Sequence, residues 1–429
     1  MIKKILAALF FFFQVAWCGQ PSAEDGVVND CFGNKFVEHV VNDGYAAILC
    51  ENFRRPIVVV GLVFDVGSLN APQNKFGIAE IVAENIIHPE TREQLRNLGI
   101  SCNVTMTATY TEILAEMHPK HVKKFFEIMG ENLSKFSVAN LGILKKQMII
   151  DSKLADYYSE NIVKNAIFSH MKLKGKNAAY QIFNEKSLQS ISEEDVEQFF
   201  AKNYLDCHLA VVVSGALSDQ NLLESLPLMG AGRRRKAISR DICGDHCFKD
   251  IFLESRYIGR SLRYFYKIPG EDNGDFSAVF FHVFNYEAFK FFEKMHPLLV
   301  GYEVRDILDH GDCLRQICLR PRGDVSLEDL RRTYEIFVDR MRKKHFSPEF
   351  LAKVAKIRDY KYRILFADPR SLCQKIRDVH MTGKSINSIC KIQDQIKSAC
   401  SSALKTFAQK ILGENLTFRI TTRYNARAP

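Results

Sequence analysis

The chain shows the same order of expected strands and helices twice, and this repetition limits it to a pair of similar domains. Each half begins with apolar strands, continues through amphipathic helices, and ends in an apolar strand, HLAVVVSG in the first half and LTFRITTR in the second. A repeat of about 200 residues is far longer than a solenoid unit. It predicts two stacked domains, each made of a sheet layer and a helix layer.

The opening of the first half has the pattern of a sheet followed by a helix. Residues 37–50 read as strand, turn and strand, with Asn42-Asp43-Gly44 as the turn, which is a hairpin signal. Residues 56–66 are rich in valine and predict a third strand. The period then changes, because apolar residues after Gly77 recur on one helical face. A strand pair is expected within residues 101–117.

Later helices are marked by capping residues at their starts. Ser192 precedes Asp195 by three residues, which is the spacing of a capping box. Ser326 and Asp329 repeat this pattern in the second half, and residues 141–170 read as mostly helical. We therefore expect an α+β protein of two homologous domains, each a mostly antiparallel β-sheet packed with α-helices.

The boundary between the halves is placed at a segment with turn residues and positive charge. Residues 227–247 contain Pro227, glycines and the run RRRK, so we interpret them as a linker. The N-terminal domain then covers residues 27–226 and the C-terminal domain residues 248–429. In an exported protein, the RRRK run is expected to be a solvated, protease-sensitive hinge.

Residues 1–18 are not expected to belong to the fold. Two lysines precede an apolar run that ends at Trp17, and small or polar residues follow it. This order is typical of a secretory signal peptide, with cleavage after Cys18. Cys18 is alternatively a lipid-modified first residue, although Trp17 is large for the usual recognition sequence. We expect export to a periplasm-like compartment, and no later segment is long and apolar enough to span a bilayer.

Charge and cysteine content limit the partners and cofactors. The formal net charge of +9 is small for 429 residues, so nucleic-acid binding is not expected, whereas an acidic partner or an anionic membrane surface is permitted. Twelve cysteines in an exported chain suggest some disulfides. Cys243 and Cys247 enclose His246, but the second Cys/His pair of a zinc finger is missing. A disulfide or two buried thiols is therefore preferred to a metal site there.

Three segments resemble the insulinase/pitrilysin family of metallopeptidases, which includes the mitochondrial processing peptidases. They are the strand region VVNDGYAAILCENFRRPIVVVGLVFDVGS, the helix start Gly77-Ile78-Ala79, and the block SISEEDVEQFFAKNYLDCHLAVVVSG. The resemblance implies a LuxS/processing-peptidase-like fold in which the two domains form half of a clamshell. It spans nearly all of the chain after the leader, although the second half is covered by element order more than by motif.

The family's chemistry lies in an H-x-x-E-H motif, where two histidines one turn apart bind zinc and the glutamate acts as general base. In register with the helix start named above, those three positions hold Glu80, Ala83 and Glu84. A further family ligand falls near Met148 or Ile149, and neither is a usual zinc ligand. Because alanine cannot accept a proton, the resemblance implies a chain with no catalytic residues and no bound zinc.

Another metal site is an alternative reading of the same helix. Glu80, Glu84 and His88 stand at i, i+4 and i+8, so on one continuous helix they would form a row suited to a harder cation than zinc. None of the other histidines forms H-x-x-E-H or H-E-x-x-H with a neighbouring glutamate. A change of register therefore does not restore the family motif.

Non-catalytic chains of two-subunit relatives often keep an Arg and a Tyr in the C-terminal half that hold the substrate backbone. Tyr302, which follows Gly301, is the candidate for this tyrosine. The arginine is missing, because Phe289 or Lys290 stands near its place. The alternative is that Tyr302 is an ordinary packing residue.

The resemblance and its departures give one main hypothesis and two alternatives. The main hypothesis is a catalytically inactive subunit that forms a heterodimer with an active paralogue of the family and encloses unfolded peptides in the periplasm. The first alternative is a structural scaffold in a larger assembly without peptide handling. The second is an active metallopeptidase that uses Glu80 and Glu84 with a different metal.

Overall fold

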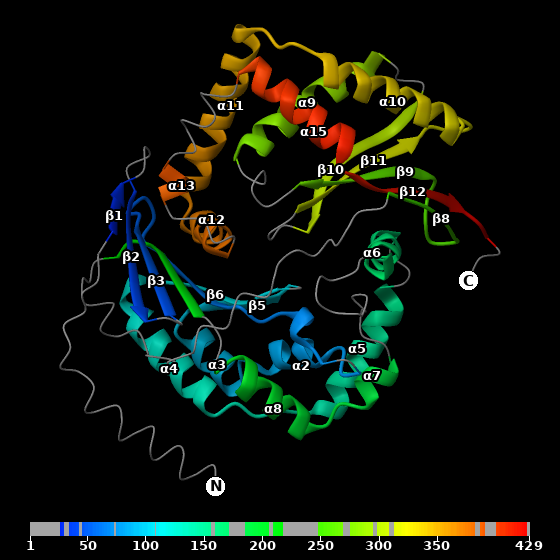
Figure 1. Ribbon diagram of the computed structural model, residues 1–429. Coiled ribbons are helices and arrows are strands. Elements are labelled where there is room, and N and C mark those ends of the chain that lie inside the picture. The colour runs from blue at the N-terminus through cyan, green and yellow to red at the C-terminus, as the bar shows by residue number, and fades with distance from the viewer. Residues whose placement is uncertain are drawn as a thin grey trace.

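Two β-sheets, each packed with helices, make up the computed structural model of the chain (Figure 1). The described residues are 26–29, 34–42, 45–72, 74–107, 109–155, 159–170, 185–205, 209–217, 248–268, 275–294, 298–308, 313–381, 387–390 and 400–426. The predicted signal peptide, the linker at 227–247 and the Cys243–Cys247 pair lie outside these ranges.

The first sheet has seven strands in the order β1-β2-β3-β7-β4-β6-β5. Their bounds are Gly26–Asn29 (β1), Lys35–Asn42 (β2), Tyr45–Glu51 (β3), Val58–Phe64 (β4), Ser101–Met106 (β5), Thr111–Met117 (β6) and Leu209–Gly215 (β7). Only β3 and β7 pair in parallel among these strands, so the expectation of a mostly antiparallel sheet is confirmed. The expected hairpin is the antiparallel pair β2 and β3.

Only glycine can occupy residue 215, the last position of β7. Gly215 has φ of +136°, and a Cβ there would overlap the carbonyl oxygen of Ile57. The backbone can approach that closely only because glycine lacks a side chain. This is the glycine that ends the HLAVVVSG strand, and it lets β7 lie fully buried between β3 and β4.

Helices of the first half follow the order expected from the sequence, with additions. Their bounds are Ile78–Asn85 (α2), Pro89–Asn97 (α3), Val122–Ser134 (α4), Leu141–Ala155 (α5), Ser159–His170 (α6), Glu185–Gln189 (α7) and Glu193–Asn203 (α8), with short 3-10 turns at Ser68–Asn70 (η1) and Pro119–His121 (η2). Figure 1 shows α2, α3, α4 and α8 on one side of the first sheet. The capping box at Ser192 and Asp195 is confirmed.

The second sheet repeats the first in the order β10-β11-β9-β12-β8. Its bounds are Lys249–Ser255 (β8), Ser261–Ile268 (β9), Leu299–Leu308 (β10), Cys313–Pro321 (β11) and Leu416–Tyr424 (β12). Here β8 and β12 are the parallel pair, as β3 and β7 are in the first sheet. The order β5-β6-β4-β7-β3 therefore corresponds strand by strand to the second sheet, and the two halves have one plan.

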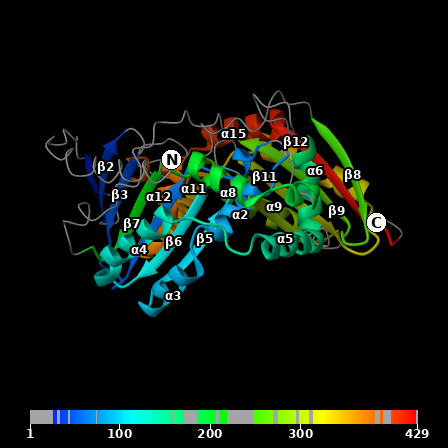
Figure 2. The same cartoon turned by 90° about the horizontal axis from the view of Figure 1, so that it is seen from below.

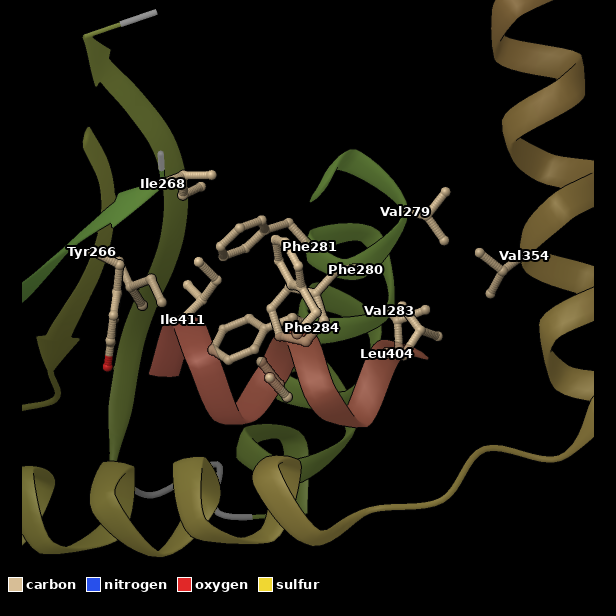
Figure 3. Packing of buried hydrophobic residues seen from close by; sticks show 14 of the residues in the cluster. Tyr266, Ile268, Val279, Phe280, Phe281, Val283, Phe284, Val354, Leu404 and Ile411 are labelled. Atoms are coloured by element: carbon tan, nitrogen blue, oxygen red, sulfur yellow. The ribbon is translucent and has the colours of Figure 1, made fainter. Parts of the chain in front are cut away.

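The core of the second half is built from aromatic residues on a long helix. The helices are Asp275–Lys294 (α9), Leu327–Lys343 (α10), Pro348–Ala367 (α11), Pro369–Met381 (α12), Asn387–Cys390 (α13) and Ser401–Glu414 (α15). Figure 3 shows Phe280, Phe281 and Phe284 of α9 between the second sheet and α15. Each fully buried side chain of this size contributes about 1.5–3 kcal/mol to folding, so α9 is a major source of stability here.

The remaining face of each sheet is covered by a helix from the other half. Helix α12 packs against β4 and β7 of the first sheet, and Arg377 of α12 pairs with the buried Glu112 of β6 at 2.5 Å. Helix α6 supplies apolar residues to a cluster on the second sheet, and its Glu160 pairs with Arg263 of β9 at 3.0 Å. The two views in Figures 1 and 2 place α6 beside the second sheet and α12 beside the first. Two exchanged helices therefore join the halves. Helix α12 supplies the arginine of its ion pair, and helix α6 supplies the glutamate of its own.

The structure departs from the sequence predictions in a few places. Strands β1, β8 and β10 were not predicted. The prediction that residues 141–170 are mostly helical is confirmed by α5 and α6, and residues 156–158 lie outside the described ranges. Four described cysteines are free thiols in this structure: Cys102, Cys318, Cys373 and Cys400.

Candidate functional site

Helix α2 carries the three positions that correspond to the family motif. Gly77 precedes it with φ of 99°, a left-handed conformation that glycine adopts without strain. The helix buries its apolar face, which includes Ile78, Ile81 and Val82. It contacts β5, α5 and α8, so its other residues stand at the edge of the first sheet beside these elements.

Glu80 lies in the first turn of α2 with its carboxylate partly enclosed. Its Oε2 atom is buried, and no described residue gives it a hydrogen-bond partner. Burial raises the pKa of Glu80 above its ordinary value of 4.5, with a smaller lowering effect from its own backbone N–H group. Where the family has a histidine, this chain therefore has Glu80, and burial favours the neutral form of its carboxyl group.

The two other motif positions supply little to a metal site. Ala83 is buried and has no atom that could accept a proton or bind a metal. Glu84 is exposed, one turn after Glu80. With alanine at residue 83, α2 has no proton acceptor at the position where the family has its general base.

Helix α5 would supply the remaining family ligand, and it does not. Met148 is buried in the first core, and Ile149 packs against the same cluster. Zinc in proteins is held by cysteine, histidine and carboxylate ligands, so a thioether and a hydrocarbon do not complete a zinc site. No group of three or more His, Cys, Asp or Glu side chains with metal-binding geometry occurs in the described part of the chain. These residues do not fit the family's zinc ion.

The alternative row of Glu80, Glu84 and His88 is wrong. Helix α2 ends at Asn85, and His88 is instead the residue before α3. Its Nε2 atom accepts a hydrogen bond from the backbone of Ser137 at 3.3 Å. A continuous helix would have been required for the i, i+8 relation, and the chain turns before residue 88.

Tyr302 lies in β10, next to α9 of the second half. Its hydroxyl donates to Oδ1 of Asn285 at 3.0 Å, and its ring packs 5.9 Å from that of Phe292. Burial raises the pKa of Tyr302, so its hydroxyl remains protonated and able to donate. Of the two residues near the expected arginine, Phe289 is largely exposed and Lys290 lies over the ring of Tyr286. The structure brings no arginine of α9 to Tyr302.

Two strand edges next to these positions were not recognised from sequence. Among the described strands, β5 pairs only with β6 and β10 only with β11, so each forms one edge of its sheet in this part of the chain. In β5 the side chains alternate between exposed and half-buried, and α2 contacts this strand. The alternation in Ser101–Met106 predicted a strand, but whether a strand is central or at an edge depends on tertiary pairing that the pattern does not contain.

A second feature missed in the sequence fixes the turn between α7 and α8. The Nζ atom of Lys75 contacts Asp195 at 2.7 Å and the carbonyl oxygen of Ser190 at 2.5 Å. Lys145 of α5 donates to the carbonyl oxygens of Gln189 and Ile191. The pKa of Asp195 is lowered to about 2, chiefly by its hydrogen bond to Lys75. These contacts hold α8 in place beside α2.

Comparison with known proteins identifies a matching family pattern and similar solved structures. Residues 47–185 match the sequence pattern of the insulinase family (peptidase family M16). A search of the curated proteins finds no matching sequence. Among solved structures, a protease from Helicobacter pylori is similar with a TM-score of 0.75 at 11% identity, over 94% of this chain and 99% of that one.

Two further solved structures bear on the architecture. The inactive domain of an M16 peptidase from Pseudomonas fluorescens has a TM-score of 0.75 at 13% identity, over 95% of this chain and 99% of that one. The periplasmic protease PqqL from Escherichia coli has a TM-score of 0.74 at 9% identity, over 94% of this chain and 46% of PqqL. The chain therefore spans about half the length of PqqL. None of the helices in the described ranges has the length and apolarity needed to cross a bilayer.

Proposed function

From the premise that residues 47–185 belong to the insulinase family (peptidase family M16), we propose that this chain is a catalytically inactive subunit. It pairs with an active zinc-peptidase paralogue and helps to enclose peptide substrates in the periplasm. The predicted signal peptide and the likeness to PqqL, which is described as a periplasmic protease, support the location.

The observation that carries the proposal is the composition of α2. The fold keeps the helix, its glycine start and its place beside β5, but Ala83 stands where the family has its general base. Glu80 and Glu84 replace two neutral, nitrogen-donating ligands by acids, one buried without a partner and one exposed. The framework of the site is therefore present while its proton acceptor and its zinc ligands are missing.

Pairing with a second chain is supported by size. PqqL has about twice the length of this chain, which covers 46% of it. A protein of two such units can be made from one long chain or from two short ones. The likeness to a domain described as inactive supports the assignment of this chain to the non-catalytic unit.

Peptide binding is assigned to the open edge of β5. An extended peptide can add as a strand to an exposed sheet edge, with main-chain hydrogen bonds giving affinity. The exposed residues of β5 stand at every second position and are all polar: Ser101, Asn103 and Thr105. This face of the strand is therefore not expected to select particular peptide sequences. This suits a chain that encloses unfolded peptides of varied composition.

We assign opening of the space that encloses the peptide to the contact between this chain and its active paralogue. Within this chain, α6 and α12 each cross to the opposite sheet, so separation of the halves would expose both helices and break the Arg377–Glu112 pair. Removal of one partner from a buried ion pair costs about 3–5 kcal/mol. The chain therefore moves as one body, and substrate entry is gated by its partner.

The test is metal content and peptidase activity of the purified chain, alone and with a co-purifying paralogue that carries an intact motif. We expect no stoichiometric zinc and no cleavage by the chain alone, with cleavage in the mixture. The matched control is the same mixture with the glutamate of the paralogue's motif changed to glutamine. Zinc and cleavage by the chain alone would contradict the proposal, and a salt-resistant complex without any such paralogue would support a scaffold role instead.

A further inference from the structure

Helix α11 has an exposed side on which apolar and basic residues alternate. Ile357, Tyr360 and Ile364 are 46%, 65% and 55% exposed. Their spacing of three and four residues places them on one side of the helix. The opposite side is anchored in the second core by Val354 and Phe366, so the exposed row is not the result of a loosely packed helix.

Lysine residues flank this row. Lys353, Lys356 and Lys361 are exposed, and no acidic side chain of the described residues pairs with them. By helical geometry, Lys356 and Lys361 lie on either side of Tyr360 and Lys353 lies one and a half to two turns before it. On this part of α11 the exposed Arg363 pairs with Asp359 at 2.8 Å, and the half-buried Arg358 donates to the hydroxyl of Tyr362 at 3.1 Å.

The first half contacts the C-terminal end of α11. Asn52 donates to the carbonyl oxygen of Phe366 at 2.8 Å, and Arg55 pairs with Asp368 at 3.2 Å. These contacts hold the turn between β3 and β4 at the C-terminal end of α11, where Phe53 is 65% exposed. We call Ile357, Tyr360 and Ile364 of α11, with the three lysines, the α11 surface. Figure 1 shows α11 at the side of the molecule, leading from the second half toward α12.

We propose that the α11 surface binds an anionic membrane surface peripherally. Apolar side chains flanked by lysines are the composition of a helix that lies in the plane of a bilayer interface, with the apolar row among the acyl chains and the lysines at anionic headgroups. The positive charge of the lysines, unopposed by paired acids, selects an anionic surface rather than a neutral one.

A protein partner fits this surface less well. A stable protein interface buries about 1,000 Å² or more around a well-packed apolar centre. The α11 surface is a single convex helix with one row of apolar side chains, which a planar lipid layer can accept without a complementary groove. The inference does not depend on the proposed function, because it concerns a helix distant in sequence from α2 and β5.

The experiment is co-sedimentation of the full mature chain with vesicles of phosphatidylcholine, with and without phosphatidylglycerol. We expect binding only to the vesicles that contain phosphatidylglycerol, and weaker binding at high salt because the Debye length shortens. Ile357→Ser/Tyr360→Ser/Ile364→Ser and, separately, Lys353→Glu/Lys356→Glu/Lys361→Glu should each weaken binding by about tenfold or more.

A matched control comes from helix α5. Ile143, Ile150 and Leu154 are 69%, 51% and 52% exposed, and their triple change to serine removes a comparable apolar area elsewhere. This control should bind as the unchanged chain does, and circular dichroism should confirm that all variants are folded. The proposal is overturned if the unchanged chain does not bind, if neutral vesicles bind it equally, or if the α5 variant loses binding as much as the α11 variants. A dimer in sedimentation velocity that the α11 variant abolishes would also overturn it, in favour of a second copy as occupant.

Discussion

The Oε2 atom of Glu80 is buried without a hydrogen-bond partner among the described residues, and the effect of this carboxyl group on stability depends on pH. Burial raises its pKa, so the folded protein holds this proton to a higher pH than the unfolded chain, whose carboxyl has the ordinary value of 4.5. Between pH 4.5 and the raised pKa the folded state binds more protons, and stability falls as pH rises. At neutral pH this residue therefore opposes folding.

Glu80→Gln is expected to stabilise the protein at pH 7 by about 1 kcal/mol, since the amide carries no charge to desolvate. The gain should vanish below pH 4.5, where the carboxyl is protonated in both states. Thermal unfolding at pH 4 and pH 7 measures both effects. Glu84→Gln is the control, because Glu84 is exposed and should change stability little at either pH. Destabilisation by Glu80→Gln at pH 7 would mean that the carboxylate has a binding partner.

Single residues also set the limit of what the sequence could predict about the site. Glu80, Ala83 and Glu84 were placed from the glycine start of their helix, and α2 does begin after Gly77. The row to His88 failed because Pro89 directly follows His88 and disfavours a helical conformation at that residue, a signal that the prediction did not use. The burial of Glu80 could not be predicted either, since it depends on elements from distant parts of the chain.

At the scale of the elements, α2 and α5 should still be able to form a zinc site once ligands are supplied. Their contact is the one that the family motif and its further ligand would require. We expect Glu80→His/Ala83→Glu/Glu84→His together with Met148→Glu to bind one equivalent of zinc, measured by metal analysis after gel filtration. The same variant with Ile149→Glu in place of Met148→Glu tests the neighbouring register. If both variants fold and neither binds zinc, then α2 and α5 are not in the assumed register.

The ion pair of α12 provides a test of how the halves are joined. Glu112 is 2% exposed and pairs with Arg377, whereas Glu116 and Arg370 form a similar pair at the surface. Arg377→Ala should destabilise the protein by about 3–5 kcal/mol, because it leaves a buried carboxylate unpaired. Arg370→Ala should cost about 1 kcal/mol or less. Urea unfolding of both variants gives the comparison, and equal losses would show that the Arg377 pair is not desolvated as the structure indicates.

Elements with strong periodicity were predicted, and those defined by pairing were not. Helix α2 has a regular apolar row, and its predicted start after Gly77 agrees with the structure, as does the predicted start of α10 at Ser326. Strand β10 was missed because Leu299–Leu308 mixes charged and apolar residues on a strand paired along only one side. Strand β8 lacks a regular alternation of apolar and polar residues, so its place in the sheet follows from its pairing with β12.

For the whole molecule, the exchange of α6 and α12 is the feature that no local pattern indicated. The repeat predicted two similar domains but not that each would cover the open face of the other's sheet. Both helices lie well inside their own halves in sequence, and their apolar rows do not show which sheet they contact. Such a contact is set by the stacking of the domains and is visible only in three dimensions.

The exchange predicts the outcome of cutting the chain between its halves. Trypsin is expected to cleave first at the RRRK run, the predicted hinge in the linker at 227–247. The fragments should remain together, because separation would uncover the apolar clusters under α6 and α12 and break the buried Arg377–Glu112 pair. Gel filtration of the cleaved protein should therefore show one peak at the size of the intact chain, and the Arg377→Ala variant should release its fragments at lower urea. If the cleaved halves of the unchanged protein separate in buffer alone, the crossed helices do not hold the molecule together, and the linker rather than the packing makes it one body.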